Sequence, residues 1–255
     1  MIKFFRHIRK SLIQENKMGK PALPAGRYFK YAIGEIILVV IGILIALGIN
    51  NWNEHRKDLE KEKNISDNLQ VEFKKNLKLI ETNLQEINNN EQACLMLMKS
   101  MKQDIDKANT KTIDSLIYWA LEHNTFNPSN STYTEILNTG KIELIQNKQL
   151  KSSLFDWSRE LEVNKSTHYI FEKWVEEAIL PYLSKKIAIK NIDMHGALLW
   201  DKASDFESGV ADILNDREFE NLIDNNLYHI SKIKSEYQKL KTIIDMILSE
   251  TKSND

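Results

Sequence analysis

A chain of 255 residues is long enough to bury a sizeable core in one or two domains. With 28% charged residues, eight glycines and four prolines, it is helix-rich, poor in turns and not disordered. Residues 1–30 carry a charge of +7 and residues 50–255 a charge of −7, and this acidic main part argues against nucleic acid as a partner, because binding to phosphates needs a basic face.

The chain begins with a basic amphipathic segment over residues 2–13. In a helix there, the apolar stripe is formed by Ile2, Phe5, Ile8 and Leu12. The basic side chains lie largely elsewhere on that helix, and they are Lys3, Arg6, Arg9 and Lys10. Such a helix is suited to lie on the anionic inner leaflet of a membrane. The alternative is that these charges only fix the topology of the next segment.

Residues 31–50 predict a transmembrane helix. Ala32 to Ile49 would be roughly 27 Å long as an α-helix, which is the short end of a bilayer core. From Ile36 to Ile49 the run holds six isoleucines, three leucines and two valines. Together these side chains favour insertion by about 5 kcal/mol. Glu35 costs less than this because it lies close to the edge of the span.

The basic residues before the span predict its direction. Eight Lys and Arg residues precede it, whereas residues 50–65 hold four basic and four acidic residues. The positive-inside rule therefore places the N-terminus in the cytoplasm and the main domain outside it. A cleaved signal peptide is the alternative, because Ala46-Leu47-Gly48 is a small-x-small site. The long basic region and the polar helix pattern after the span favour an uncleaved anchor.

Small residues form one stripe along the span. Gly34, Gly42 and Ala46 are separated by multiples of four residues, and Glu35 lies beside them. Small side chains let two helices approach closely in lipid, so these four residues form a candidate intramembrane interaction site. Three roles stay open for Glu35: contact with the cytoplasmic headgroups near Lys30, a hydrogen bond to a partner helix, or proton or ion coupling.

After the span, apolar residues recur in a heptad pattern that is typical of a long helix. This first seam consists of Leu77, Ile80, Leu84, Ile87, Cys94, Met98, Met101 and Ile105, with Glu91 interrupting it. An unbroken helix from Glu54 to Lys107 would run about 80 Å, which is long for a globular protein. The three asparagines at 88–90 are therefore a candidate bend.

Two more seams predict two more long helices. The second seam holds Leu150, Leu154, Trp157, Leu161, Asn164, His168, Phe171, Val175 and Ile179. Pro181 follows and should kink or end that helix. The third seam holds Phe219, Leu222, Asn226, Ile230, Ile233, Tyr237, Leu240, Ile244 and Ile247. The polar Asn164 and His168 are expected to fix the register between helices rather than to bind a ligand.

Shorter elements fill the rest of the chain. "TIDSLIYWALEHN" predicts a short helix, and "TYTE" (132–135) is a capping pattern for another, which Gly140 can close. "NDRE" (215–218) is a capping pattern before the third seam, and residues 188–206 predict a loop or small hairpin. The fold class expected is all-α: one N-terminal transmembrane helix followed by a coiled-coil-like antiparallel bundle of long helices.

The sequence holds no motif that carries catalysis. It has no glycine-rich phosphate loop and no Cys/His cluster, so we expect no enzyme, no cofactor and no metal site. His168 and Glu172 stand one helical turn apart, but two such ligands alone are a weak signal. Cys94 lies on an apolar seam and is expected in the core. The remaining aromatic candidates for a ligand cage are expected in the core as well: Trp119, Trp157, Trp174 and Trp200.

Several motifs resemble an uncharacterised family of single-pass membrane proteins common in Bacteroidetes. The motifs are "MIKFFRxIR" at the start, then "YAIGEI", "IGILIAL" and "INNWNE", and later "STYTEILNTGKIELIQNKQL" (131–150). No activity or ligand is established for that family, so the resemblance assigns no functional residue. It does imply a Gram-negative inner membrane, and hence a periplasmic main domain.

The expected organisation is a basic cytoplasmic segment and linker (1–30), a transmembrane helix (31–50) and a periplasmic helical bundle (51–255). The leading function is a non-enzymatic scaffold or interaction module. Its partners would be the lipid bilayer together with a second copy of the chain or another inner-membrane or envelope protein. The alternative is a periplasmic sensor of small molecules that signals through a membrane partner.

Overall fold

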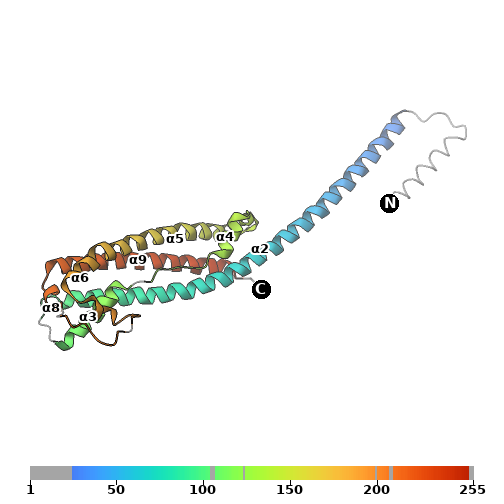
Figure 1. Ribbon diagram of the computed structural model, residues 1–255. Helices are drawn as coiled ribbons and strands as arrows, with labels where there is room; N and C mark the ends of the chain where they lie inside the picture. Colours follow the sequence, from blue (N-terminus) through green and yellow to red (C-terminus); the bar gives the residue numbers. More distant parts are fainter. Residues whose placement is uncertain (1–24, 104–106, 123, 199, 207–208, 253–255) are drawn as a thin grey trace, which may run out of the picture. The chain divides into compact units, whose positions relative to one another are not determined.

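The computed structural model is all-α in the residues that it describes, which are 25–103, 107–122, 124–198, 200–206 and 209–252 (Figure 1). The chain divides into two compact units, Met1–Leu59 and Glu60–Asp255. The helix α2 (Ala25–Ser100) contributes residues to both units. All other labelled helices belong to the second unit, where they form a bundle.

The second unit is built on three long helices that lie side by side in Figure 1: the later part of α2, α5 (Lys148–Trp174) and α9 (Arg217–Glu250). Cross-helix contacts give their directions. Phe73 packs on Trp157, and Glu62 accepts from the backbone N–H of Gln146, so α2 and α5 run the same way. Lys234 pairs with Glu91 and Lys241 with Glu81, so α9 runs antiparallel to them.

One extended segment makes the parallel pair possible. After α2 the chain forms α3 (Lys107–Leu121) and then returns along α2 as residues 124–130, which we call the strap. The strap leads into α4 (Ser131–Asn138) and the short 3₁₀-helix η1 (Lys141–Leu144), after which α5 begins. The strap carries the chain back along α2. Helix α5 can therefore start at the end of the bundle where the second unit's part of α2 also starts.

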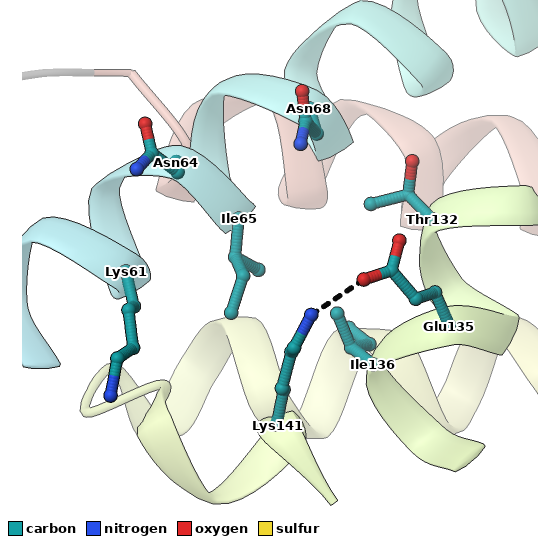
Figure 2. A pocket seen from close by; sticks show the side chains of 8 residues that line it. All are labelled: Lys61, Asn64, Ile65, Asn68, Thr132, Glu135, Ile136 and Lys141. Atoms are coloured by element: carbon teal, nitrogen blue, oxygen red, sulfur yellow. Dashed lines mark hydrogen bonds and ion pairs between the residues drawn. The ribbon is translucent and has the colours of Figure 1, made fainter. Parts of the chain in front are cut away.

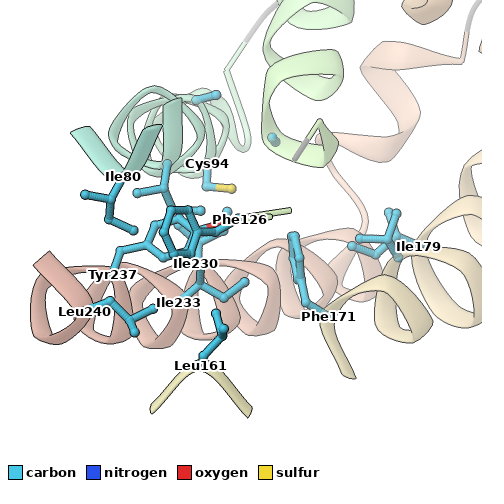
Figure 3. Close-up of a cluster of buried hydrophobic side chains, with 14 of the residues drawn as sticks. Ile80, Cys94, Phe126, Leu161, Phe171, Ile179, Ile230, Ile233, Tyr237 and Leu240 are labelled. Atoms are coloured by element: carbon cyan, nitrogen blue, oxygen red, sulfur yellow. The ribbon is translucent and has the colours of Figure 1, made fainter. Parts of the chain in front are cut away.

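The core is filled by the second and third seams, and every residue predicted for these two seams is buried. Figure 3 shows part of this core, with Phe171 and Leu161 from α5 facing α9, and Phe126 of the strap beside Tyr237. The largest fully buried side chains include Trp157, Tyr237 and Phe126. The apolar periodicity of these segments therefore predicted their packing faces correctly.

The first seam only partly matches the buried face of α2. Ile80, Ile87 and Cys94 are buried as expected, but Leu77, Leu84, Met98 and Met101 are only partly buried. Ile105 lies outside the described residues. The buried face of α2 instead carries Leu69, Phe73, Ile80, Ile87, Cys94 and Leu97 together with Asn76, Asn83 and Asn90. A search for apolar residues misses this face, because the three asparagines place polar side chains at core positions. The helix also passes through residues 88–90 without interruption.

Pro181 does not end its helix. The π-helical turn η2 (Val175–Ile179) follows α5 directly, and α6 (Leu180–Lys186) carries the helical chain past the proline. A π turn changes the hydrogen-bond register, so the missing N–H of Pro181 and its ring can be accommodated. The region 188–206 contains the short helix α7 (Ile189–Asp193) and otherwise irregular backbone in its described residues.

The helix ends test the capping predictions. Asp216 caps α9 by accepting from the N–H of Glu218, as the "NDRE" pattern predicted. The "TYTE" prediction was wrong, because α4 begins at Ser131 and its cap residue Asn130 makes no side-chain capping bond. Gly140 follows α4 with φ of 69°, the left-handed conformation that its position predicted. The short helix α8 (Val210–Ile213) precedes α9.

Candidate functional site

The apolar part of α2 is fully exposed. Every side chain from Ala32 to Ile49 is exposed, and none of this stretch is buried against another described segment. By length and composition this is the one candidate membrane-spanning helix among the described residues. An exposed run of isoleucine, leucine and valine of this length is covered in a stable protein by lipid or by another apolar surface.

The predicted intramembrane residues lie on this exposed stretch. A side chain added at Gly34 or Gly42 would meet no atom within 4 Å beyond the backbone of the helix itself. Glu35 and Ala46 are also exposed. The stripe is therefore sterically open to another helix. The predicted inner-leaflet residues Lys3, Arg6, Arg9 and Lys10 lie outside the described residues.

Polar side chains follow directly after the apolar run. Asn50 donates to the carboxylate of Glu54 at 3.1 Å, one helical turn further on. The guanidinium of Arg56 lies 5.9 Å from the centre of the Trp52 ring and also donates to Asn53. A tryptophan with polar and charged neighbours is typical of the interface between lipid and water. This part of α2 therefore has the composition of a membrane boundary.

Three asparagines on α2 hold the returning chain. Asn76, Asn83 and Asn90 are spaced by seven residues, so they share one face, and we call them the asparagine ladder. Asn76 donates to the carbonyl oxygen of Ser129 at 2.8 Å and accepts from its N–H at 2.9 Å. Asn83 donates to the carbonyl oxygen of Asn124 at 3.1 Å.

Asn90 completes the ladder at the end of α3. It donates to the carbonyl oxygens of Trp119 and Glu122, and Asn226 of α9 donates to that of Ala120 at 2.8 Å. The ladder residues are each at most 4% exposed, so water cannot replace these bonds. Buried amides that pair with backbone carbonyls satisfy polar groups which would otherwise be costly to bury.

The strap inserts one large side chain into the bundle. Phe126 is 1% exposed, and its ring meets those of Trp157 and Tyr237 edge to face at centroid distances of 6.1 and 5.9 Å. Tyr237 also donates its hydroxyl hydrogen to the carbonyl oxygen of Asn124 at 3.1 Å. A single aromatic anchor and a set of main-chain hydrogen bonds thus fix the strap between α2, α5 and α9.

A carboxylate of α2 caps the helix that follows the strap. Glu72 is 5% exposed and accepts hydrogen bonds from the hydroxyls of Ser129 and Ser131, at 2.7 and 3.0 Å. It also accepts from the backbone N–H of Thr132 at 3.0 Å. A negative charge at a helix N-terminus is favourable because the first N–H groups are otherwise unpaired. Glu72 therefore supplies the cap that Asn130 does not.

A small hollow opens where α2 faces α4 and η1 (Figure 2). Its volume is about 220 Å³, and its lining residues are Lys61, Asn64, Ile65, Asn68, Thr132, Glu135, Ile136 and Lys141. Ile65 and Ile136 are buried and give it an apolar floor. Figure 2 shows the Lys141 side chain directed at Glu135, with 2.6 Å between the ammonium nitrogen and a carboxylate oxygen.

Polar groups inside the bundle join helices to one another. The Nε2 atom of His168 lies 2.7 Å from the hydroxyl oxygen of Tyr237. The two side chains are therefore joined by a hydrogen bond, with the donor set by the histidine tautomer. Burial raises the pKa of Tyr237 well above its ordinary value. Asn164 and Thr167 of α5 both donate to the buried carboxylate of Glu236. The seam residues Asn164 and His168 thus make cross-helix bonds, and their role in fixing the register stays a prediction.

The other candidates for chemistry are placed separately. Glu172 is exposed whereas His168 is buried, so the pair does not share one environment. Within the described residues, no group of three or more His, Cys, Asp or Glu side chains is placed to hold a metal ion. Cys94 is buried as predicted, and burial raises the pKa of its thiol to about 11, which keeps it protonated and unreactive at neutral pH.

The tryptophans correct one prediction. Trp157 is fully buried and Trp174 is partly buried, in keeping with the expectation for the core. Trp119 and Trp200, however, are 45% and 48% exposed, so the four do not form one buried set. Trp119 lies beside Tyr118 near the end of α3, and Trp200 lies under the ammonium of Lys190. Apolar neighbours in sequence do not bury a side chain near the end of a helix or in a loop.

The residues missed by sequence reasoning are the ladder and Glu72. A signal for the ladder exists, because the three asparagines recur every seven residues. Each lies four residues before an apolar position or Cys94, namely Ile80, Ile87 and Cys94. No such signal exists for Glu72, whose partners are distant in sequence.

Comparison with known proteins gives one match. Neither the curated proteins nor the solved structures contain a match to this chain. The matched segment holds the apolar part of α2, the ladder, the strap, α4 and the first part of α5. Over residues 35–160 the chain is similar to a family of unknown function (DUF6090).

Proposed function

We propose that the protein is a membrane-anchored helical module that acts by binding another protein or a second copy of itself, and that it is not an enzyme. The observation that carries the proposal is the exposed apolar run from Ala32 to Ile49, which lies in the same helix, α2, whose later part belongs to a well-filled bundle. An anchor of this kind restricts the bundle to a membrane surface, where partners are also concentrated.

We propose further that the anchor crosses the inner membrane with the N-terminus in the cytoplasm and the bundle in the periplasm. Eight basic residues before the span support this orientation. The lack of a catalytic role is supported by how the buried polar side chains are used. Glu236, His168 and the ladder are all engaged in contacts between helices or with the strap.

The topology is tested with reporters fused after Asp255. A reporter that is active only in the periplasm should work, and one that is active only in the cytoplasm should fail. The opposite pattern would refute the periplasmic placement. Release of the bundle as a soluble species would instead favour the cleaved signal peptide.

Association through the span is tested with the small-residue stripe. Gly42→Ile should reduce self-association of the span in a bilayer, because the larger side chain keeps two helices apart. Ile43→Leu is the matched control and should leave association unchanged. Glu35→Gln should be tolerated if Glu35 only forms a hydrogen bond. Equal self-association of wild type and Gly42→Ile, with no membrane partner lost, would refute the stripe as an interface.

A sensor of small molecules is the second candidate, and the hollow between α2 and α4 is the observation in its favour. Its lining combines charged and amide side chains with two isoleucines. A ligand that binds only the folded state raises the melting temperature by mass action. Heating the full chain in detergent with candidate periplasmic metabolites therefore separates the two functions: a sensor gains stability, and an interaction module does not.

A further inference from the structure

The strap is held in the way that a protein holds a bound peptide. Four of its hydrogen bonds go to main-chain atoms, which are the same for any sequence. Its side chains bind as well, and the indole N–H of Trp157 donates to the side-chain oxygen of Asn130 at 2.8 Å. Asn76 pairs with both the N–H and the carbonyl of Ser129, and Asn83 and Tyr237 both donate to the carbonyl of Asn124. The donors come from two helices, α2 and α9. Recognition of an extended main chain by side-chain amides needs no particular peptide sequence.

Only one strap side chain is used as a deep anchor. Phe126 is buried against Trp157 and Tyr237, whereas Asn124, Asn127 and Ser129 are exposed. Pro128 cannot donate a main-chain hydrogen bond, and its imide favours an extended conformation in the residue before it. The segment "NTFNPSN" thus combines an aromatic anchor with a main chain that α2 and α9 hold by hydrogen bonds.

The charges beside the strap restrict what could replace it. Asn124 donates to the carboxylate of Glu86 at 2.9 Å, two residues before the anchor. Ser129 donates to the carboxylate of Glu72 at 2.7 Å, three residues after the anchor. Carboxylates at both ends accept hydrogen bonds from neutral or basic side chains and repel acidic ones. A segment bound in this place is therefore expected to carry neutral or basic side chains at these two positions.

We propose that α2, α5 and α9 form a groove for an extended peptide with one aromatic anchor, and that the strap occupies this groove as an internal ligand. The partner is a protein segment with a Phe-like anchor and neutral or basic residues two positions before and three positions after it. This rests on the proposed function as an interaction module and names the class of partner. Displacement of the strap would also detach from α2 the segment that connects α3 to α4.

The test uses the full chain in detergent micelles and a labelled synthetic peptide, NTFNPSN. In the wild type the strap competes at a high effective concentration, so the peptide should bind at least about tenfold more weakly than to a variant with a vacant anchor site. Phe126→Ala creates that vacancy. We expect saturable binding of NTFNPSN to Phe126→Ala, together with a rise in its melting temperature.

Two control peptides make the test specific. NTANPSN lacks the anchor and should neither bind nor stabilise the variant. DTFNPDN places acidic residues opposite Glu86 and Glu72 and should bind more weakly than NTFNPSN, with the difference shrinking at high salt. If Phe126→Ala does not fold, Phe126→Leu underfills the same site and is used in its place.

The outcomes that would overturn the peptide groove are distinct from those that test the proposed membrane anchor. No saturable binding of NTFNPSN to either variant at millimolar concentration would refute the groove as a peptide site. Equal binding of NTFNPSN and NTANPSN would refute the aromatic anchor. Neither result changes the expected topology or the association of the span, which are measured separately with reporters and with Gly42→Ile.

Discussion

The contact between α5 and α9 and the contact between α2 and the strap lie in the same bundle but use different chemistry. α5 and α9 meet through two facing rows of apolar side chains, with a few polar pairs such as Thr167 and Glu236. α2 meets the strap mainly through amide side chains that pair with main-chain atoms, together with the carboxylates of Glu72 and Glu86, which accept from strap side chains. In the contact between α5 and α9, both helices carry a recognisable sequence pattern. In the contact between α2 and the strap, only α2 carries one.

This difference has a physical consequence for substitution. An apolar seam loses contacts in proportion to the volume removed, and the neighbouring side chains can partly relax. A ladder amide is paired with fixed main-chain groups, so its removal leaves those groups unpaired. The first contact should therefore depend on side-chain size, and the second on side-chain chemistry.

The largest effect is expected within the apolar seam. Ile233→Ala removes buried volume from a fully buried position on α9 and should lower the free energy of unfolding by about 2–5 kcal/mol. Val163→Ala on the exposed face of α5 is the control and should change it by less than about 0.5 kcal/mol. Urea denaturation of the full chain in detergent measures both. Similar losses in the two variants would contradict the assigned packing faces.

A smaller but chemically specific effect is expected in the ladder. Asn76→Ala leaves both main-chain groups of Ser129 without their partner and should cost about 1–3 kcal/mol. Asn89→Ala, on the exposed side of the same helix, should be neutral or slightly stabilising, because alanine is the better helix former. If both variants unfold at the same urea concentration, the ladder does not contribute to stability.

The turn after α4 should show an effect of about 1 kcal/mol. Gly140 has φ of 69°, so Gly140→Ala places a side chain in an unfavourable backbone region. Gly140→Asn should lose less, because asparagine tolerates the left-handed conformation. The two melting temperatures distinguish backbone strain from a change in contacts, since no atom lies within 4 Å of the added Cβ.

The smallest effect concerns pH and lies on α3, which joins α2 to the strap. Burial raises the pKa of Asp114, and the nearby charge of His195 opposes this shift. The folded state therefore holds the proton more tightly than the unfolded state, and stability falls as the pH rises from below the ordinary carboxyl pKa through the raised one. Asp114→Asn should remove this decline in urea midpoints. An unchanged pH profile would contradict the assignment.

The two contacts also differ in how well the sequence predicts them. Trp157, Phe171, Ile233 and the other residues of the second and third seams could be assigned because burial of apolar surface imposes a helical period. The ladder could not be assigned from hydrophobicity, since Asn83 reads as a surface residue until its carbonyl partner is known. The contacts of Glu72 depend on chain folding across some sixty residues, and no local pattern encodes that.

The candidate sites follow the same division. Gly34, Gly42 and Ala46 could be assigned to one face of the span because helical geometry alone decides it. What covers that face is not encoded in the same segment, since an interface depends on a second surface. The groove proposed for the strap was not predicted, for a related reason. The segment that fills it belongs to the same chain, so no empty cavity marks it.

The order of the contacts that α2 makes with residues 119–146 also bears on how the chain folds. Sequence separation grows steadily along α2, from 32 residues at Asn90 to 41 at Asn83, 53 at Asn76 and 84 at Glu62. Each contact that closes shortens the loop required by the next, so the entropic cost of each step stays small. The chain that follows α3 can thus pack onto α2 step by step, starting at the α3 end, before α9 has been synthesised. Pulse-labelled hydrogen exchange should then find α2 and α4 protected earlier than the first turns of α9.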